Sequence, residues 1–597
     1  MRIRIRMCDM YMRRIAGIVA ALSVSGWTVC AHAAQSGVWS GDDGFERAVL
    51  AVSGAGDLSE LSESEMERYY GLLRHPVNVN ADGRTRLEEV LDNWRAASVL
   101  DYRARNGDIL SWTELASVDG FNAGMVAVLK PFLSIAPSSG GSRSGISGKG
   151  TDVLLRSTVK GDGSDPVVYD YAAKYRYSGP RLSLAMTIKR LSASPSFAPE
   201  TVGFGAEYRA RRYPLRIVLG DYHARFGQGL ALWSGFSMSG FGTVDAFRRR
   251  ATGIRQAWTL SPDYALRGAA VEWDGAIGTV SGMLTQEGVL GGNFRRVGRR
   301  SSAGVTAYMT LIPDGEGRRE GMVAADCRWT PWRVLKRCEL FAEVGYDLAA
   351  CKAAFVGGLV WTPAYRRRYA LMLRSYPDGM RSSHAGAPRA FSALGDETGV
   401  AVGMKTGTSS GLQLGITADA ALRPVKKSSQ LRTITDAAMP VAGWLVIKPR
   451  LTWRLRAADK VPERTDLRID ADVAAGAWSG RMRVEVVRCE DISYLYYIEA
   501  GYRGGRVTLH ARTTAFAADR WNDRIYSYER DVPGMFTVPA YYGRGLSCQV
   551  LCSLKTGHGR IYLRAAMTHY SAGPLRDGGY IAKPDSFSLR VQYSAGF

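Results

Sequence analysis

The sequence predicts a mainly β protein, in which a small all-α domain precedes a large antiparallel transmembrane β-barrel of about 20–24 strands. Segments of about ten residues with alternating apolar and polar side chains follow one another over most of the chain. A helical pattern is confined to the region from about residue 58 to residue 133. Beyond the N-terminal segment, no run reaches the ~18 uncharged apolar residues that a membrane helix needs.

Residues 1–33 have the pattern of a secretory signal peptide. Several arginines precede an apolar stretch from Ile15 to about Val29, and Ala31-His32-Ala33 has the form of a signal peptidase site. The mature chain is therefore predicted to be exported and to start near Ala34. A lipoprotein that begins at Cys30 is the alternative interpretation.

The chain is strongly basic, with a formal net charge of +22. Such an excess predicts anionic surroundings, namely lipid phosphates, acidic glycans or nucleic acid, and a basic solvated surface explains it equally well. Of the eight cysteines, two lie in the signal peptide and the others are scattered without a Cys-x-x-Cys pair. Neither a zinc site nor a disulfide framework is supported, and no metal or cofactor is predicted.

Residues 34–133 are predicted to form the helical domain. Asn80 or Asp82 is expected to cap one helix, and Ser111 a second helix after a break at Gly107. Residues 134–150 are rich in glycine and serine and are predicted to be a flexible linker to a barrel that spans residues 151–597.

The helical region resembles the tandem helix-hairpin-helix module of ComEA-type competence proteins. The resemblance implies hairpin turns whose backbone N–H groups bind DNA phosphates. The first turn here, Leu91–Arg95, lacks glycine, and the second turn, Gly120–Asn122, has asparagine in place of the second glycine. The alternative is a module retained as a periplasmic scaffold or plug. The resemblance is carried by Asn78-Val79-Asn80-Ala81, Tyr102-Arg103, Asn106-Gly107, Ser111, Glu114-Leu115 and Val118-Asp119-Gly120, and it marks Asn80, Arg103, Gly107, Gly120 and Asn122 as candidate DNA-binding residues.

The last predicted strand, Ser586–Phe597, shows the alternation most clearly. Phe587, Leu589 and Val591 point to one side, and Arg590 and Gln592 point to the other. A terminal aromatic residue on such a strand resembles the signal that the outer-membrane insertion machinery recognises. A soluble all-β secreted protein is the alternative, but it would need several domains and a second linker.

The segment Gly220–Gly242 interrupts the alternation with glycines and aromatic residues. It is predicted either to fold inward and constrict the lumen or to form one strand with an external loop. A second long stretch, Arg520–Gly545, is predicted to be a structured loop. The candidate constriction residues are Asp221, Arg225, Gln228, Trp233, Arg248, Arg249 and Arg250.

Both stretches, together with Arg267–Trp273, resemble outer-membrane proteins of Bacteroidetes that join a helix-hairpin-helix segment to a large barrel. The resemblance implies an architecture and a location, not an activity. The barrel is expected in the cell outer membrane of a Gram-negative bacterium, with the helical domain in the periplasm. The expected partners are outer-membrane lipid and lipopolysaccharide, the barrel insertion machinery, and DNA or another anionic polymer.

The predicted function is a pore, transport or assembly component of the outer membrane. The first alternative is a DNA-binding receptor for DNA uptake, and the second is an outer-membrane hydrolase. Gly407–Gly411 matches Gly-x-Ser-x-Gly, but it is predicted to lie at a hairpin tip and lacks the strand-to-helix setting of a catalytic serine. No catalytic residue is predicted.

Overall fold

The computed structural model describes most of the chain downstream of the predicted signal peptide. The predicted cleavage site, most of the predicted linker and Phe597 lie outside the described residues. Described are residues 41–138 and 150–596, except 163–166, 180, 191–196, 236–241, 261–264, 299, 314–316, 332–336, 365, 381, 393, 409, 459–460, 558, 572, 575–579 and 582–584.

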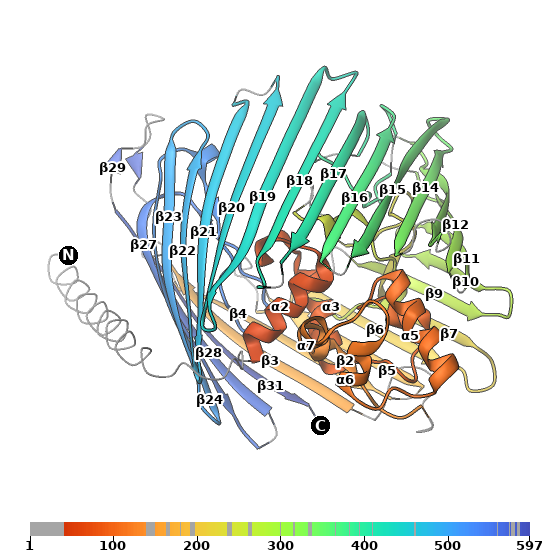
Figure 1. Ribbon diagram of the computed structural model, residues 1–597, viewed down its shortest axis with the longest axis horizontal. Helices are drawn as coiled ribbons and strands as arrows, with labels where there is room; N and C mark the ends of the chain where they lie inside the picture. Colours follow the sequence, from red (N-terminus) through yellow and green to blue (C-terminus); the bar gives the residue numbers. More distant parts are fainter. Residues whose placement is uncertain are drawn as a thin grey trace.

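The helices form one compact group, drawn in red to orange in Figure 1. We call residues 41–138 the helical domain. It has its own apolar core, which includes Val49, Leu87 and Phe132. None of the described helices is long and apolar enough to cross a membrane. The elements are α2 (Gly41–Ser53), η2 (Leu58–Glu60), α3 (Glu63–Arg74), α4 (Arg84–Leu87), α5 (Asn93–Asn106), α6 (Trp112–Ser117), α7 (Ala123–Leu129) and η3 (Lys130–Phe132), and a short parallel pair of strands, β1 (Val77–Asn78) with β2 (Leu133–Ser134).

The rest of the described chain closes into one antiparallel ring of 24 strands, which confirms the predicted fold class. The last strand closes the ring, because β31 pairs with β28 on one side and with β3 on the other. The ring strands are β3 (Gly150–Gly161), β4 (Val168–Ser178), β5 (Leu182–Lys189), β6 (Thr201–Arg209), β7 (Leu215–Arg225), β9 (Leu266–Asp274), β10 (Thr279–Thr285), β11 (Val289–Val297), β12 (Ser301–Thr310), β13 (Gly321–Trp329), β14 (Cys338–Asp347), β15 (Lys352–Ala364), β16 (Arg367–Tyr376), β17 (Glu397–Gly407), β18 (Gln413–Arg423), β19 (Ser428–Ala442), β20 (Leu445–Ala457), β21 (Glu463–Ala475), β22 (Trp478–Arg488), β23 (Ile492–Arg503), β24 (Val507–Ala518), β27 (Gly543–Lys555), β28 (Gly559–Tyr570) and β31 (Ser586–Gly596).

The two faces of the ring follow the alternation of the sequence. On β31, Phe587, Leu589 and Val591 are exposed on the outside, whereas Arg590 and Gln592 are buried inside. The same division recurs around the ring, with outward leucine, valine, isoleucine and aromatic side chains. An apolar outer surface of this kind suits lipid rather than water.

The two rims of the ring differ in the length of their connections. Gly150 and Gly596 lie at one rim, which we call the termini rim, because β3 starts where β31 ends. The connections there are short, for example 443–444 and 476–477. The opposite rim, which we call the loop rim, carries the long connections 226–265, 377–396 and 519–542.

The interior of the ring is partly an apolar core, although the inward-facing residues of a strand such as β31 are polar. Phe226, Leu230 and Leu232, from the connection after β7, pack in one cluster with inward-facing residues such as Met322 and Met372. The inner wall is apolar here because the connection that folds against it brings apolar side chains. The inward-folded parts include η4 (Val244–Phe247), β8 (Gly253–Gln256), η6 (Trp521–Asp523), β25 (Ile525–Tyr526) and β26 (Ala540–Tyr541), and two further short strands, β29 (Gly573–Pro574) and β30 (Tyr580–Ile581), precede β31.

Candidate gate in the barrel lumen

The helical domain lies inside the ring, near the termini rim. Its acidic side chains pair with inward-facing cations on strands all around the wall, from Lys174 on β4 through Arg328 on β13 to Arg483 on β22. The Arg84 side chain also donates to the carbonyl oxygen of Gly298, in a connection at the termini rim. The domain therefore occupies the lumen at this end.

The contact between domain and barrel is strongly polarised in charge. In each of the following pairs the domain supplies the carboxylate and the barrel supplies the cation. A negatively charged body is thereby held in a positively charged lumen. The pairs are Glu46 with Arg481 and Arg530, Asp57 with Arg468 and Arg483, Glu60 with Arg450, Glu67 with Lys174, Glu88 with Arg295 and Arg328, Glu89 with Arg255, Asp92 with Arg248, Arg250 and Arg368, Asp101 with Arg300, and Asp119 with Arg337.

Asp92, in the turn between α4 and α5, is the most heavily paired carboxylate of the contact. Its Oδ1 lies 3.2 Å from a guanidinium nitrogen of Arg368, 3.5 Å from one of Arg248 and 3.7 Å from one of Arg250. Burial alone would raise the pKa of Asp92, but Arg368, Arg95, Arg248 and Arg250 lower it well below its ordinary value of 3.8. The carboxylate is therefore ionised at neutral pH.

Glu88 and Glu89 extend this acidic turn. Glu88 lies 2.7 Å from Arg84 of its own domain and 3.3 Å from Arg328 of the wall. Burial raises the pKa of Glu88, and the arginines around it reverse this effect and lower the pKa to about 2. The pKa of Glu89 is lowered in the same way, chiefly by Arg255.

Such a contact is suited to reversible docking. Buried ion pairs add little net stability compared with apolar packing, because both ions lose their hydration. Removing one partner is costly, however, since the other charge is left buried. The ion pairs therefore hold the domain in one position, and water can hydrate both partners again if the whole domain moves away.

The connection after β7 closes part of the lumen with a tight turn at Phe226–Leu230. Glu343, buried on the inner face of β14, accepts hydrogen bonds from the backbone N–H groups of Gln228 and Leu230. Gly227 and Gly229 have φ values of +57° and +92°, which allows the turn to direct its N–H groups at the carboxylate. A wall residue thus fixes the inward fold of the glycine-rich segment.

The other two long connections also enter the lumen from the loop rim. The connection 377–396 reaches the turn, where the backbone N–H of Gly386 donates to the Gly229 carbonyl oxygen at 2.9 Å. In the connection 519–542, Arg530 lies 2.6 Å from Glu46 of the helical domain. Tyr528 and Phe536 pack against the core of that domain. The described residues therefore fill the lumen from both rims.

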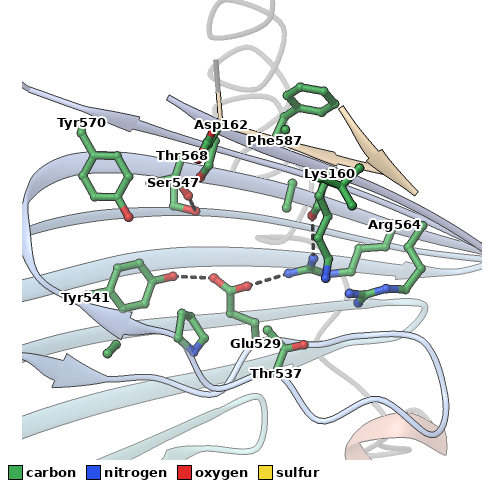
Figure 2. Close-up of a pocket in the computed structure, with 18 residues that line it drawn as sticks. Lys160, Asp162, Glu529, Thr537, Tyr541, Ser547, Arg564, Thr568, Tyr570 and Phe587 are labelled. Atoms are coloured by element: carbon green, nitrogen blue, oxygen red, sulfur yellow. Dashed lines mark hydrogen bonds and ion pairs between the residues drawn. The ribbon is translucent and has the colours of Figure 1, made fainter. Parts of the chain in front are cut away.

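A polar pocket remains open between the connection 519–542 and the wall strands β3, β27, β28 and β31 (Figure 2). Glu529 accepts hydrogen bonds from Tyr541 and from Arg564, the latter at 2.6 Å. The other cations at the pocket are also paired, Arg590 with Asp531 and Lys160 with Asp170. The pocket is a charge-balanced recess lined with hydroxyl and aromatic groups.

The candidate DNA-binding residues have structural contacts within the helical domain. The buried Asn80 side chain bonds the backbone of Ile109 and Ala136, and Arg103 donates to the Asp82 carbonyl oxygen. Asn122 caps α7 by accepting from the Met125 N–H, and Gly107 ends α5 with φ +82°. Gly120 has φ +93°, and a Cβ there would lie 2.2 Å from the Trp94 ring. Of the five, Asn80 is buried and does not lie on the surface of the domain.

Six of the seven candidate constriction residues meet inside the lumen. The guanidinium groups of Arg225 and Arg249 both lie near the Trp233 ring, 5.7 and 5.4 Å from its centre. Gln228 accepts from the Arg249 N–H, and Arg248 and Arg250 face Asp92. Asp221 is apart from them, in the wall, where it accepts from Arg267 of β9 and from the Phe204 N–H of β6.

The acidic residues of the helical domain are the part of the site that sequence reasoning missed. They lie on helices and in the turns between helices, and nothing local distinguishes them from surface charges. One signal in the sequence could have indicated this contact. The helical region is not notably basic, whereas the whole chain carries a net charge of +22, so the two regions differ in charge.

The Gly-x-Ser-x-Gly match lies where β17 ends and β18 follows, and Ser409 itself lies outside the described residues. Within the described ranges there is no group of three or more His, Cys, Asp and Glu side chains that could hold a metal ion. The six described cysteines are free thiols.

No protein-family model matches the chain, and no curated protein matches it. Among solved structures, it is similar to the ferric-catecholate import receptor Fiu from E. coli K12, with 8% identity, a TM-score of 0.38, and coverage of 74% of this chain and 81% of the receptor. It is also similar to the copper transporter OprC, with 10% identity, a TM-score of 0.39, and coverage of 75% and 81%. For the translocation pore of the P pilus usher PapC, the identity is 10%, the TM-score 0.33, and the coverage 75% and 99%. Likeness at this level identifies neither a substrate nor a partner for this chain.

Proposed function

We propose that this protein is an outer-membrane transport barrel whose helical domain is a plug that gates the lumen. The observation that carries the proposal is the ring of ion pairs between carboxylates of the helical domain and inward-facing cations of the wall. A rigid structural filling would be expected to use apolar contacts, because these stabilise more than buried charges do. In a domain that moves, ion pairs are favourable contacts, because water can hydrate the separated charges when the domain undocks.

The outward faces support a place in the membrane. Leu155, Phe204, Val305, Leu467 and Val484 are among many large apolar side chains exposed on the outside of the ring. Insertion into a bilayer would bury them, whereas in water they would form an extensive apolar surface. Outer-membrane lipid, lipopolysaccharide and the barrel insertion machinery follow as proposed partners.

The connections support an orientation. Outer-membrane barrels have short periplasmic turns and longer extracellular loops. The short connections of this ring lie at the termini rim, where the helical domain enters, so the domain is proposed to face the periplasm. The loops 226–265, 377–396 and 519–542 would then meet solutes from outside.

The DNA-uptake alternative meets an obstacle in the same contact. The hairpin turn Leu91–Arg95 carries Asp92, which is buried against the wall and surrounded by arginines. DNA could reach this turn only after the domain had left the barrel. We therefore keep transport as the proposed function.

The proposal is tested by conductance in planar bilayers. We compare the full mature chain with a variant that lacks residues 41–138 and keeps the signal peptide. The full chain is expected to be closed and the deletion variant to conduct. Heat-modifiable migration on gels checks that the deleted barrel is folded. A folded deletion variant without conductance, or a freely conducting full chain, would refute the gate.

A further inference from the structure

Three arginines stand directly opposite one another on the inner wall near the loop rim. Arg432 on β19 is the register partner of Arg454 on β20, which is in turn the partner of Arg464 on β21. Directly opposite residues of neighbouring antiparallel strands have Cα atoms about 4.5–5.5 Å apart. Like charges in such positions destabilise a sheet, so this row needs an explanation.

Two more arginines lie on the loop-rim side of this row, Arg456 opposite Gln430 and Arg423 opposite Ser428. Arg456 lies one rung nearer to the loop rim and donates to Gln430 at 2.6 Å, and Arg423 on β18 holds its guanidinium 4.5 Å from the centre of the Phe391 ring. We call these residues the arginine cluster. It consists of Arg423, Arg432, Arg454, Arg456 and Arg464.

The nearby carboxylates do not balance this charge. Asp466 accepts from Arg464 at 2.9 Å. Asp419 on β18, the register partner of Arg432, is shared with Arg374, and Glu60 of the helical domain pairs with Arg450. The buried Nε atom of Arg454 has no hydrogen-bond partner among the described residues.

The cluster lies between two of the inward-folded connections. Arg464 donates to the carbonyl oxygens of Asn522 and Arg524 in the connection 519–542. On the other side, Gln430 donates to the Ala390 carbonyl oxygen at 3.4 Å, and Phe391 stacks on Arg423, both in the connection 377–396. The arginines of the row are half-buried rather than sealed. A solute from the loop rim would meet them before it reached the helical domain.

We propose that the arginine cluster binds a multivalent oxyanion that enters the lumen from the loop rim. Guanidinium groups bind carboxylate and phosphate through paired N–H donors, and a row of arginines with fewer carboxylates than guanidinium groups beside it is suited to an anion. Arginines that line a pore also favour the passage of anions. The inference rests on the proposed function and names a substrate class for it. Anion binding at the cluster requires only that the barrel is folded, and it does not require that the helical domain opens the lumen.

The spacing of the row favours a ligand with more than one charge. A monovalent anion would neutralise one guanidinium and leave the charge on the neighbouring arginines, whose Cα atoms are about 5 Å apart, without an added counter-charge. A ligand with two or three oxyanion groups can meet adjacent arginines at once. Phosphate and carboxylate groups share this chemistry, and the test separates them.

The test is calorimetric titration of the full mature chain in detergent with pyrophosphate and, separately, with citrate. At least one of the two is expected to bind, and orthophosphate more weakly. The double variant Arg432→Gln with Arg454→Gln is expected to lose at least tenfold in affinity. The matched control is Arg544→Gln, since Arg544 is exposed near the loop rim and pairs with Asp519 outside the cluster. Binding only of pyrophosphate would assign the phosphate class, and binding only of citrate the carboxylate class.

A second measurement needs no ligand. Because Arg454 is placed between two like charges, Arg454→Gln is expected to raise the thermal unfolding temperature of the ligand-free protein, while Arg544→Gln leaves it unchanged or lowers it. Absence of binding by both anions, equal binding by the double variant, or a lower unfolding temperature of Arg454→Gln would each overturn the site. The conductance of the plug deletion is independent of these results, so failure of the gate and failure of the site are distinguishable.

Discussion

At the scale of single residues, Asp92 is the carboxylate of the proposed gate that contacts the most arginines. Its carboxylate contacts the guanidinium groups of Arg248, which follows η4, of Arg368 on β16 and of Arg95 on α5. Arg248 and Arg368 have second carboxylate partners in Glu339 and Asp245, but Arg250 pairs only weakly with Asp92 at 3.7 Å. Loss of the Asp92 charge would therefore leave excess positive charge in a buried place.

Replacement of Asp92 is predicted to loosen the plug. Asp92→Asn keeps the size of the side chain and removes its charge, and breaking one side of a buried ion pair costs about 3–5 kcal/mol. An effect of about 3 kcal/mol raises the undocked fraction by roughly two orders of magnitude. Hydrogen exchange of the helical domain and bilayer conductance measure this.

The matched control is Asp119→Asn. Asp119 also pairs with the wall, through Arg337, but its side chain is 62% exposed, and exposed pairs contribute about 0–1 kcal/mol. If both variants behaved alike, burial of the Asp92 charge would not be what holds the domain.

Contacts between residues close in the sequence could be predicted at this scale, and contacts between residues far apart in the sequence could not. Ser111 caps α6 as predicted, because its side chain accepts from the N–H of Glu114, three residues ahead. Asn80 does not cap a helix, since Gly83 precedes α4 and the Asn80 side chain instead bonds Ile109, far along the chain. The partners of Glu88 and Asp92 are more distant still, and no local pattern reveals them.

At the scale of elements, the turn Phe226–Leu230 shows which contacts hold the glycine-rich segment inside the lumen. Its conformation depends on two left-handed glycines and on the Glu343 carboxylate. The alternation predicted that the segment is unusual but left open whether it folds inward or outward. Inward folding depends on Glu343, and in the sequence Glu343 is only one polar residue of a distant strand.

The turn is predicted to be intolerant of a side chain at Gly229. In Gly229→Ala the φ of +92° becomes strained, and the new Cβ would lie 3.1 Å from the Gly386 backbone. Strain of this kind costs about 1–3 kcal/mol, which should appear as faster hydrogen exchange in 226–232. Gly505→Ala is the control, since no atom lies within 4 Å of a Cβ there and its φ is not left-handed. Equal exchange in both variants would contradict the role of the turn.

At the scale of the whole molecule, the closed ring could be predicted, whereas an inward-folded Gly220–Gly242 and a plug formed by the helical module could be given only as alternatives. Alternation repeated over many strands predicts a closed barrel, because each strand carries the same signal. The occupied lumen depends on which of several basic and acidic segments meet, and that is decided by three-dimensional closure. The inward-facing side of a strand such as β31 is polar, as its alternation predicts, but the lumen is apolar where the connection after β7 packs against the wall.

Docking of the whole plug is predicted to weaken in acid. Asp57, Glu60, Glu88, Glu89 and Asp92 all have lowered pKa values in the docked state. Their stabilisation is complete above the ordinary values of 3.8 for Asp and 4.5 for Glu and is lost as the pH falls through the lowered values, about 2 for Glu88. Conductance of the full chain is therefore expected to rise between pH 4.5 and about pH 2. Conductance that stayed flat over this range, with the barrel still folded, would contradict an electrostatic hold.

The covalent path from the helical domain to the first wall strand has a kinetic consequence. Only residues 139–149 separate the last described position of the domain, Ser138, from Gly150 at the start of β3. This stretch spans at most about 40 Å when fully extended. A domain expelled from the barrel therefore stays at a local concentration of the order of millimolar beside its own entrance. Re-entry is a first-order event, so the length of an opening does not depend on how many copies of the protein the membrane holds.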